Sequence, residues 1–383
     1  MRIVYIIESL VNKGGTERII TEKANYLSDC YGYEVYVITC TQFVEEPNAY
    51  KLSDSVKQIN LSIPYYSQYR YKYPKRLWVK YSLQSKIKKE LTTTIQKINP
   101  DILIGTAHFK ANIISTIKCQ AKKIIECHEA RYFTQSGLGQ HQNLYSRLYL
   151  KLYRNIYLRT IEKNADSIVT LTTGDKKLWG KTKHVEVIPN FSTMTIQKYS
   201  KCDSKRVIAV GRLGWEKGYQ RLLDIWKLVI DNHTEWQLVI FGEGELESDL
   251  KSHIEKNNIK NVIIHKNTDD ISIEYGNSSI CVMTSYFEGF ALVLLEAQRH
   301  GVPCIAFDCP FGPGSIIQND KCGFLIENGD TNLFAEKLSI LMENEKLRKQ
   351  FSLAARERAE FFSVDLIMCH WKQLFESLDN KEL

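Results

Sequence analysis

Two glutamates close to one predicted helix are well placed to do chemistry. Glu288 lies in the loop after a predicted strand, and Glu296 lies early in a predicted helix that is otherwise almost wholly apolar. A carboxylate in such surroundings is seldom buried unless it is paired or holds a ligand. Carboxylates accept hydrogen bonds from the vicinal hydroxyls of a sugar or ribose. The free N–H groups at the helix start, over residues 289–292, suit an adjacent anion.

A second loop, residues 211–218, carries two cations directly after another predicted strand. Arg212 and Lys217 could hold one anion between them, the first as a planar fork and the second as a point charge. The alternative is that both are solvated surface charges, and we expect both on an exposed loop. Their position favours a ligand, because parallel α/β sheets bind ligands at the carboxyl ends of their strands.

Two further loops contain paired glycines. Gly14 and Gly15 follow the first predicted strand and precede a helix from about Thr16. They allow either close approach to a phosphate or simply a tight turn. Gly242 and Gly244 begin a dinucleotide-binding pattern, but Glu247 stands where its third glycine should be, so that interpretation is weak.

These loops need strands to position them, and short apolar runs alternate with longer amphipathic segments along the chain. The runs are continuously apolar, as in parallel strands covered on both faces. Two series of strand–helix alternation predict an α/β chain with two Rossmann-like, doubly wound parallel-sheet domains. The predicted strands are 2–7, 34–39, 58–61, 101–104, 123–126, 167–171 and 185–188, then 206–210, 236–241, 261–265, 280–284, 304–307 and 323–326.

Length and composition are typical of a globular chain with two hydrophobic cores. A chain of 383 residues exceeds what one core usually holds, and the polar stretch after residue 189 places a boundary between domains 1–195 and 196–363. Hydrophobic content of 44% and charged content of 25% exclude disordered and collagen-like classes. No apolar run is long enough to span a membrane. The ten cysteines form no C-x-x-C pair, which argues against zinc or redox sites and for a reduced, cytoplasmic chain.

Several motifs, taken in chain order, resemble the group 1 retaining glycosyltransferases (family 4). They are Gly14–Gly15, Val187–Asn190, Gly211–Leu213 with Glu216–Gly218, and Glu288–Phe290 through Leu295–Ala297. The stretch 306–313 resembles one common in members that use UDP-hexoses or UDP-N-acetylhexosamines for bacterial surface glycans. Phe311 and Ser315 depart from that pattern, in which a small polar residue and a glutamate are usual.

The resemblance implies the type B glycosyltransferase fold, in which two domains face a central cleft. Residues 1–195 would bind the acceptor, with a crossover helix over 364–383, and residues 196–363 would bind the nucleotide-sugar. The implied reaction moves a hexose or N-acetylhexosamine from a UDP-sugar to a glycan or polyprenyl-diphosphate-linked saccharide in bacterial surface polysaccharide synthesis. No cofactor or metal is implied beyond the nucleotide-sugar co-substrate, and the D-x-D triplet of metal-dependent enzymes is absent from the sequence.

The resemblance also implies roles for individual residues. Arg212 and Lys217 would hold the donor diphosphate, Glu288 the sugar hydroxyls and Glu296 the ribose. His128 would act near the reacting sugar, although a lone histidine is often only a structural hydrogen-bonding group. The implied catalytic set is His128, Glu288, Arg212 and Lys217, and the implied donor-binding set is Gly14, Gly15, Arg212, Lys217, Glu288, Gly289, Phe290, Ala291, Leu292 and Glu296.

Charge is distributed unevenly and bears on partners. Residues 1–195 hold 29 Lys and Arg against 16 Asp and Glu, whereas residues 196–383 hold 22 against 28. Basic and aromatic residues interleave over 65–89 and 131–163, as in helices that lie on an anionic bilayer surface. Their apolar faces could instead pack on the first sheet. We expect peripheral attachment to the inner face of the cell membrane.

Other functions remain open from the residues alone. A nucleotide-sugar epimerase or a phosphorylase of the same fold would have a similar chain, but the context of Glu288 and Glu296 and the short length argue against both. Stacking of bases on the segment 65–89 would make a nucleic-acid-binding protein. No nucleic-acid module accompanies that segment, so we expect no nucleic-acid partner. A sugar-binding protein without activity is disfavoured by the intact motifs.

Overall fold

The computed structural model describes the chain except residues 108, 130–143, 181, 183, 269 and 380–383. The described residues form two units. The first comprises Met1–Ile188 and Ile367–Leu383, and the second comprises Pro189–Leu366. No helix within the described part of the chain is both long enough and apolar enough to cross a bilayer.

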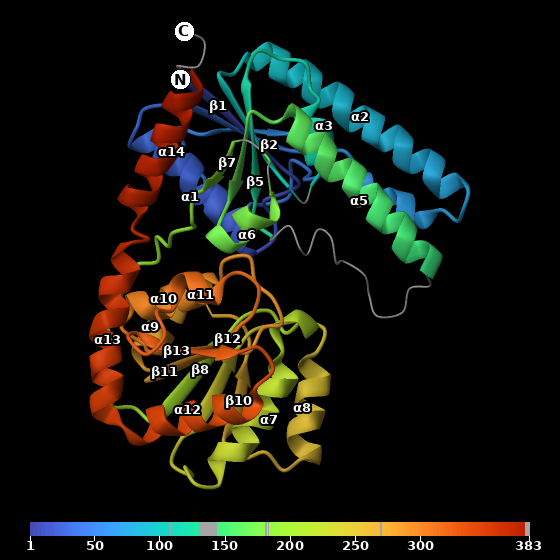
Figure 1. Ribbon diagram of the computed structural model, residues 1–383. Helices are drawn as coiled ribbons and strands as arrows, with labels where there is room; N and C mark the ends of the chain where they lie inside the picture. The colour runs from blue at the N-terminus through green and yellow to red at the C-terminus, as the bar shows by residue number, and fades with distance from the viewer. Residues whose placement is uncertain (108, 130–143, 181, 183, 269, 380–383) are drawn as a thin grey trace. The chain divides into compact units, whose positions relative to one another are not determined.

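The first unit is built on a parallel sheet in the order β3-β2-β1-β4-β5-β6-β7 (Figure 1). The order turns away from β1 in both directions, which is the doubly wound arrangement. Its strands are β1 (Arg2–Ile7), β2 (Glu34–Thr39), β3 (Lys57–Asn60), β4 (Ile102–Thr106), β5 (Lys122–Cys127), β6 (Ser167–Thr170) and β7 (Val185–Val187). Its helices are α1 (Gly15–Asp29), the 3₁₀ turn η1 (Tyr65–Arg70), α2 (Lys75–Ile98), α3 (Ala111–Ser115), α5 (Leu144–Asn164), α6 (Thr173–Leu178) and α14 (Val364–Asp379).

Helices cover both faces of this sheet, which is why its strands are apolar on both sides. Val4 and Ile6 share a buried cluster with residues of α2, α3 and α5. Tyr5 points to the opposite face, because side chains alternate along a strand. On that face the Lys23 ammonium of α1 lies over the Tyr5 ring and over the Trp371 ring of α14.

The second unit repeats the plan with a parallel sheet in the order β10-β9-β8-β11-β12-β13. Its strands are β8 (Arg206–Val210), β9 (Gln237–Phe241), β10 (Val262–His265), β11 (Ile280–Met283), β12 (Cys304–Asp308) and β13 (Gly323–Glu327). Its helices are the 3₁₀ turn η2 (Trp215–Lys217), α7 (Tyr219–Ile230), α8 (Glu247–Lys256), α9 (Ile271–Gly276), α10 (Leu292–Arg299), α11 (Pro313–Ile316), α12 (Thr331–Glu343) and α13 (Glu345–Glu360). Helices α7, α8 and α12 share one buried cluster with Val207 and Ala209, and α9 and α10 lie on the other side of the sheet (Figure 1).

The predicted fold class, two Rossmann-like parallel-sheet domains, is confirmed by these topologies. The chain passes from one unit to the other after Ile188, earlier than the boundary expected at residue 195. The intervening segment is tied to the second unit because the Arg299 guanidinium donates to the carbonyls of Ser192 and Met194. A polar segment without periodicity therefore belongs to a domain through side-chain contacts made from far along the chain.

Candidate functional site

The loop after β8 is held in a tight conformation that brings Lys217 to the carboxyl edge of the second sheet. Gly218 adopts a φ of 65°, and a Cβ there would lie 2.2 Å from the Thr284 carbonyl oxygen. Only glycine tolerates both conditions, since it lacks a Cβ. Thr284 also donates its hydroxyl to the Gly218 carbonyl at 3.0 Å. The loops after β8 and β11 are therefore in direct contact.

Lys217 and Glu288, to which the family resemblance gives different parts of the donor, form an ion pair. The Lys217 Nζ lies 2.7 Å from Glu288 Oε1, and the Ser285 hydroxyl donates to the same oxygen at 2.6 Å. The two side chains are only 25% and 11% exposed. Lys217 is therefore not the solvated surface charge of the alternative interpretation, because it is paired with Glu288 of the β11–α10 loop.

Arg212 has a different environment. Its Nη2 lies 2.5 Å from Glu216 Oε1, within the same loop, and its side chain is 66% exposed. Glu216 is nearly buried, and its backbone carbonyl accepts the Tyr286 N–H at 2.8 Å. The guanidinium is thus anchored on one side by a carboxylate and remains open to solvent, as a group that meets a ligand must be.

The start of α10, at Leu292, follows closely on Glu288 of the Lys217–Glu288 pair. Ala291 precedes the helix with a left-handed φ of 59°, a conformation that costs an L-residue about 1–2 kcal/mol. Gly312 packs against this turn, where a Cβ would lie 2.9 Å from the Glu288 Cβ. The first N–H groups of a helix have no partner within the helix and attract anions. Gly289 and Phe290 lie in the loop, Phe290 is buried, and Leu292 begins the helix.

Glu296 lies in the second turn of α10 and is 6% exposed. The Tyr275 hydroxyl of α9 donates to its Oε2 at 3.4 Å. Burial, followed by the Glu296 charge, raises the pKa of Tyr275 well above its usual value, so the phenol stays a donor. Glu296 is therefore paired, as expected for a charged side chain in an apolar helix, and the Tyr275 phenol of α9 is a partner.

Two supporting residues were missed in the sequence. Arg221 of α7 donates to the carbonyls of Thr284 and Ser285, and thereby fixes the loop that carries Glu288. His300, at the end of α10, contacts the Glu296 carbonyl through Nδ1 and the Ser272 hydroxyl through Nε2. Burial lowers the pKa of His300, which favours the neutral ring. Neither residue belongs to a recognisable local motif, because both act on partners distant in sequence.

In the first unit, His128 follows β5 and lies next to a buried ion pair. Its Nε2 lies 3.4 Å from Glu126 Oε1, and the Lys23 ammonium contacts the same oxygen. Burial disfavours the charged form of Glu126, but Lys23 and His128 together outweigh this effect and lower the pKa of Glu126 to about 2. The histidine ring lies beside this pair at the carboxyl edge of the first sheet. Its catalytic role stays a prediction.

The glycine loops have separable roles. Gly14 caps α1, and a Cβ there would lie 2.2 Å from the Glu17 carboxylate, while Gly15 is the first residue of the helix. Gly242 and Gly244 allow the loop after β9 to approach the backbone of Gly211 and Leu213. This close packing accounts for both glycines without a bound dinucleotide.

Residues 193–358, which contain the Lys217–Glu288 pair and the start of α10, match the family described as Glycosyl transferases group 1. This part of the chain is a group 1 glycosyltransferase domain. The amylovoran biosynthesis glycosyltransferase AmsD of Erwinia amylovora is 28% identical to it, over 97% of this chain and 99% of that protein. A Campylobacter jejuni N-acetyl-D-galactosaminyltransferase, whose name gives a saccharide on PP-undecaprenol, is 25% identical over 99% of each chain.

The fold of this glycosyltransferase also has solved relatives. A Staphylococcus aureus TarM structure, in complex with Fondaparinux, alpha-GlcNAc-glycerol and UDP, superposes with a TM-score of 0.76. It is 17% identical and covers 98% of this chain and 99% of its own. At that identity the likeness establishes the two-domain fold, and the substrates of the present enzyme have to be argued from its own residues.

Proposed function

We propose that this glycosyltransferase moves a hexose or N-acetylhexosamine from a UDP-sugar to a saccharide carried on a polyprenyl diphosphate, in bacterial surface polysaccharide synthesis. The observation that carries the proposal is the Lys217–Glu288 pair, 2.7 Å apart beside the start of α10. The Lys217 cation suits a phosphate, the Glu288 carboxylate suits a sugar hydroxyl, and the N–H groups at the helix start suit a second phosphate oxygen.

In the proposed reaction, the bond from the anomeric carbon to the β-phosphate oxygen breaks and the electron pair stays on that oxygen. The acceptor hydroxyl oxygen bonds to the anomeric carbon, and its proton passes to the departing phosphate oxygen. Lys217 and Arg212 stabilise the growing charge, which is where fixed cations lower a barrier most. Lys217 is already paired with Glu288, so the diphosphate and the Glu288 carboxylate share the Lys217 ammonium. Glu288 also accepts hydrogen bonds from the hydroxyls of the donor sugar. Glu296 holds the ribose. Lys217 and Arg212 supply the positive charge that a metal ion supplies in other transferases.

The second unit binds the donor in this proposal, and the first unit, with His128 and the Gly14–Gly15 loop, binds the acceptor. Support for the first unit comes from its own features. His128 lies beside a buried ion pair at a strand end, and a hollow of about 630 Å³ opens at the same carboxyl edge of the sheet, next to β1 and β2.

We also propose that the first unit rests on the cytoplasmic face of the membrane, where such an acceptor would be found. Aromatic side chains after η1 and along the first turns of α2 project into solvent, with Tyr73 74% and Trp78 73% exposed. Cations accompany them: the Arg76 guanidinium lies 4.2 Å from the Tyr69 ring centre. The second half of α2 instead packs into the core through Ile87, Leu91 and Ile95.

The second basic-aromatic stretch supports attachment less directly. Residues 131–143 lie outside the described residues, as do the side chains of residues 144–151, 153 and 154. Of the rest of α5, Leu158 and Ile161 are buried, whereas Leu152 and Ile156 are exposed. The packing alternative therefore holds for the end of this helix.

The donor screen that tests this function uses mass spectrometry on the full-length enzyme. A panel of UDP- and GDP-sugars is offered with polyprenyl-diphosphate-linked saccharides. We expect one UDP-hexose or UDP-N-acetylhexosamine to extend the acceptor by one sugar. Transfer only from GDP-sugars, or epimerisation of a UDP-sugar without any acceptor, would contradict the proposal.

A further inference from the structure

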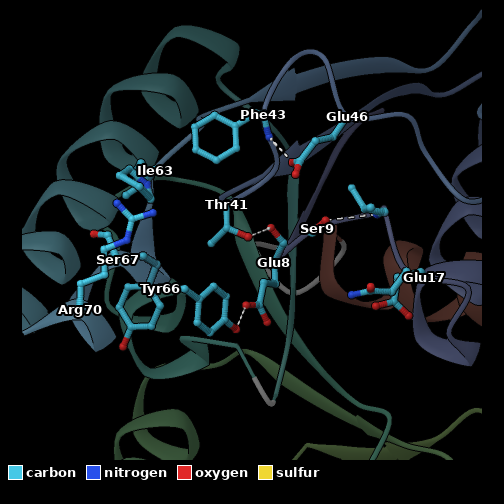
Figure 2. Close-up of a pocket in the computed structure, with 14 residues that line it drawn as sticks. Glu8, Ser9, Glu17, Thr41, Phe43, Glu46, Ile63, Tyr66, Ser67 and Arg70 are labelled. Carbon is cyan, nitrogen blue, oxygen red and sulfur yellow. Dashed lines mark hydrogen bonds between the residues drawn. The ribbon is translucent and has the colours of Figure 1, made fainter. Parts of the chain in front are cut away.

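The hollow in the first unit is lined by residues from several loops that are far apart in the sequence. It opens between the loops that follow β1, β2 and β3, together with η1 (Figure 2). These loops leave the sheet at its carboxyl edge, where α/β proteins bind ligands. The lining residues used below are Glu8, Glu17, Glu46, Tyr66 and Arg70.

The charge of the lining is opposite to that of the domain around it. Glu8, Glu17 and Glu46 line the hollow against a single cationic residue, Arg70. Residues 1–195 as a whole carry 29 basic against 16 acidic residues. An acidic hollow in a basic domain repels anions locally while the surrounding surface attracts them.

The three carboxylates of the lining accept hydrogen bonds when they are ionised. The Tyr66 hydroxyl donates to Glu8 Oε1, as Figure 2 shows. Burial, and then this contact, raises the pKa of Tyr66, so the phenol remains protonated and its one donor is committed to Glu8. Glu46 accepts the Phe43 N–H at 2.7 Å, which fixes its carboxylate on the rim. A ligand group that meets these carboxylates therefore has to be a donor, such as a hydroxyl, an amide or an amine.

The aromatic residues Phe43, Tyr65 and Tyr66 line the hollow. The Tyr66 ring is stacked on that of Tyr69, which lies outside the lining, with centres 6.2 Å apart and an interplanar angle of 14°. Both are more than half exposed. A flat aromatic surface beside a few fixed polar groups is the usual composition of a small-molecule site. Sugars have apolar C–H faces that fit such a surface, and hydroxyls that fit the carboxylates.

We infer that this hollow holds the reacting end of the acceptor, and that this end is a neutral or amine-bearing sugar without phosphate or carboxylate groups. The inference rests on the proposed function and narrows it. It excludes polyol-phosphate and uronic-acid ends. The diphosphate of a lipid-linked acceptor then lies away from the hollow, where the cations around Tyr69 and Trp78 suit it.

The test measures binding of simple sugars to the full chain, with saturating UDP, by ligand-observed NMR. The probes are the methyl glycosides of glucose, glucosamine and glucuronic acid, and glycerol phosphate. We expect the first two to bind, and the two anions to bind at least about tenfold more weakly, as a like-charge contact near a protein surface should produce. Glu8→Gln and Glu46→Gln should narrow that difference by about three- to tenfold.

Glu45→Gln is the matched control, because Glu45 is exposed, adjacent to Glu46 and outside the lining. It should leave the preference unchanged. Binding of methyl glucuronide as tight as that of methyl glucoside, no binding of any glycoside, or equal effects of Glu45→Gln and Glu46→Gln would each overturn the inference. UDP affinity, measured by calorimetry, stays separate: its absence in the wild type would overturn the proposed function instead.

Discussion

At the scale of single residues, Lys217 and Glu288 neutralise each other across two loops, and this pairing determines what a substitution at either one does. Both are largely buried, so the loss of one partner leaves the other as a desolvated charge. Arg212 is exposed and anchored by its neighbour Glu216. Its removal should disturb the surrounding structure less.

Removal of either cation should slow transfer strongly. We expect Lys217→Ala and Arg212→Ala each to lower kcat/KM by about 10²–10³-fold, the usual cost of one group that stabilises developing charge. Steady-state kinetics with the identified donor measures this. Lys251→Ala is the control, because Lys251 also pairs with a glutamate but on the surface helix α8. Wild-type kinetics in the Lys217 and Arg212 variants would refute the clamp.

Metal removal should have no such effect, because these side chains supply the cationic charge. Transfer should persist after dialysis against EDTA, with added Mg²⁺ or Mn²⁺ changing the rate by less than about twofold, well below the effect of a metal that stabilises the transition state. Loss of activity in EDTA that a divalent ion restores would show that a metal takes part.

The two glutamates should separate in UDP binding. Glu296→Gln should weaken the affinity for free UDP, because ribose is its proposed partner. Glu288→Gln should leave that affinity intact or raise it, since Lys217 loses a competing anion, while sugar transfer falls. Isothermal titration with UDP, followed by a transfer assay, distinguishes them. Equal UDP affinities in the two variants would show the division of roles to be wrong.

At the scale of elements, the junction between the loops after β8 and β11 depends on Gly218. A Cβ there meets the Thr284 carbonyl, whereas at Gly32, which has the same φ of 65°, a Cβ meets nothing within 4 Å. The two glycines therefore separate backbone strain from close contact. The strain alone costs an L-residue about 1–2 kcal/mol.

Gly32→Ala should lower stability by about that strain and leave UDP binding unchanged. Gly218→Ala should cost more, because the Thr284 backbone must move as well, and should weaken UDP binding by displacing Lys217. Denaturant unfolding followed through both units, with UDP titration, measures the two effects. Identical behaviour of the two variants would mean that the junction tolerates a side chain.

The elements themselves were largely predictable, and the reasons for the misses are physical. Continuously apolar runs located the strands, since both faces of each sheet are covered. The start of α10 was placed too early, because Ala291 takes a left-handed turn that a sequence normally marks with glycine or asparagine. Contacts such as Arg221 with the Thr284 carbonyl join positions far apart in sequence. No local pattern encodes them.

At the scale of the whole molecule, the excess of positive charge and most of the exposed aromatic residues lie in the first unit. Sedimentation with anionic liposomes at low salt should carry the protein down, and salt should release it, because screening weakens the attraction. Trp78→Ser with Tyr81→Ser should reduce binding severalfold, since aromatic rings anchor at the interface. Phe361→Ser replaces an equally exposed aromatic of the second unit and should have no effect. Failure of the wild type to bind would favour a soluble acceptor.

The first unit is made from two separate stretches of chain, Met1–Ile188 and Ile367–Leu383, with the whole second unit encoded between them. Trp371, from the later stretch, covers the Lys23 ammonium at 4.4 Å and so shields the ion pair beneath it. During synthesis on the ribosome, the second unit therefore has its full set of residues before the first does. Until α14 leaves the ribosome, the Lys23–Glu126 ion pair of the earlier stretch lacks the Trp371 ring that packs over it. A nascent chain stalled before Trp371 would carry a complete second unit and an unfinished first unit.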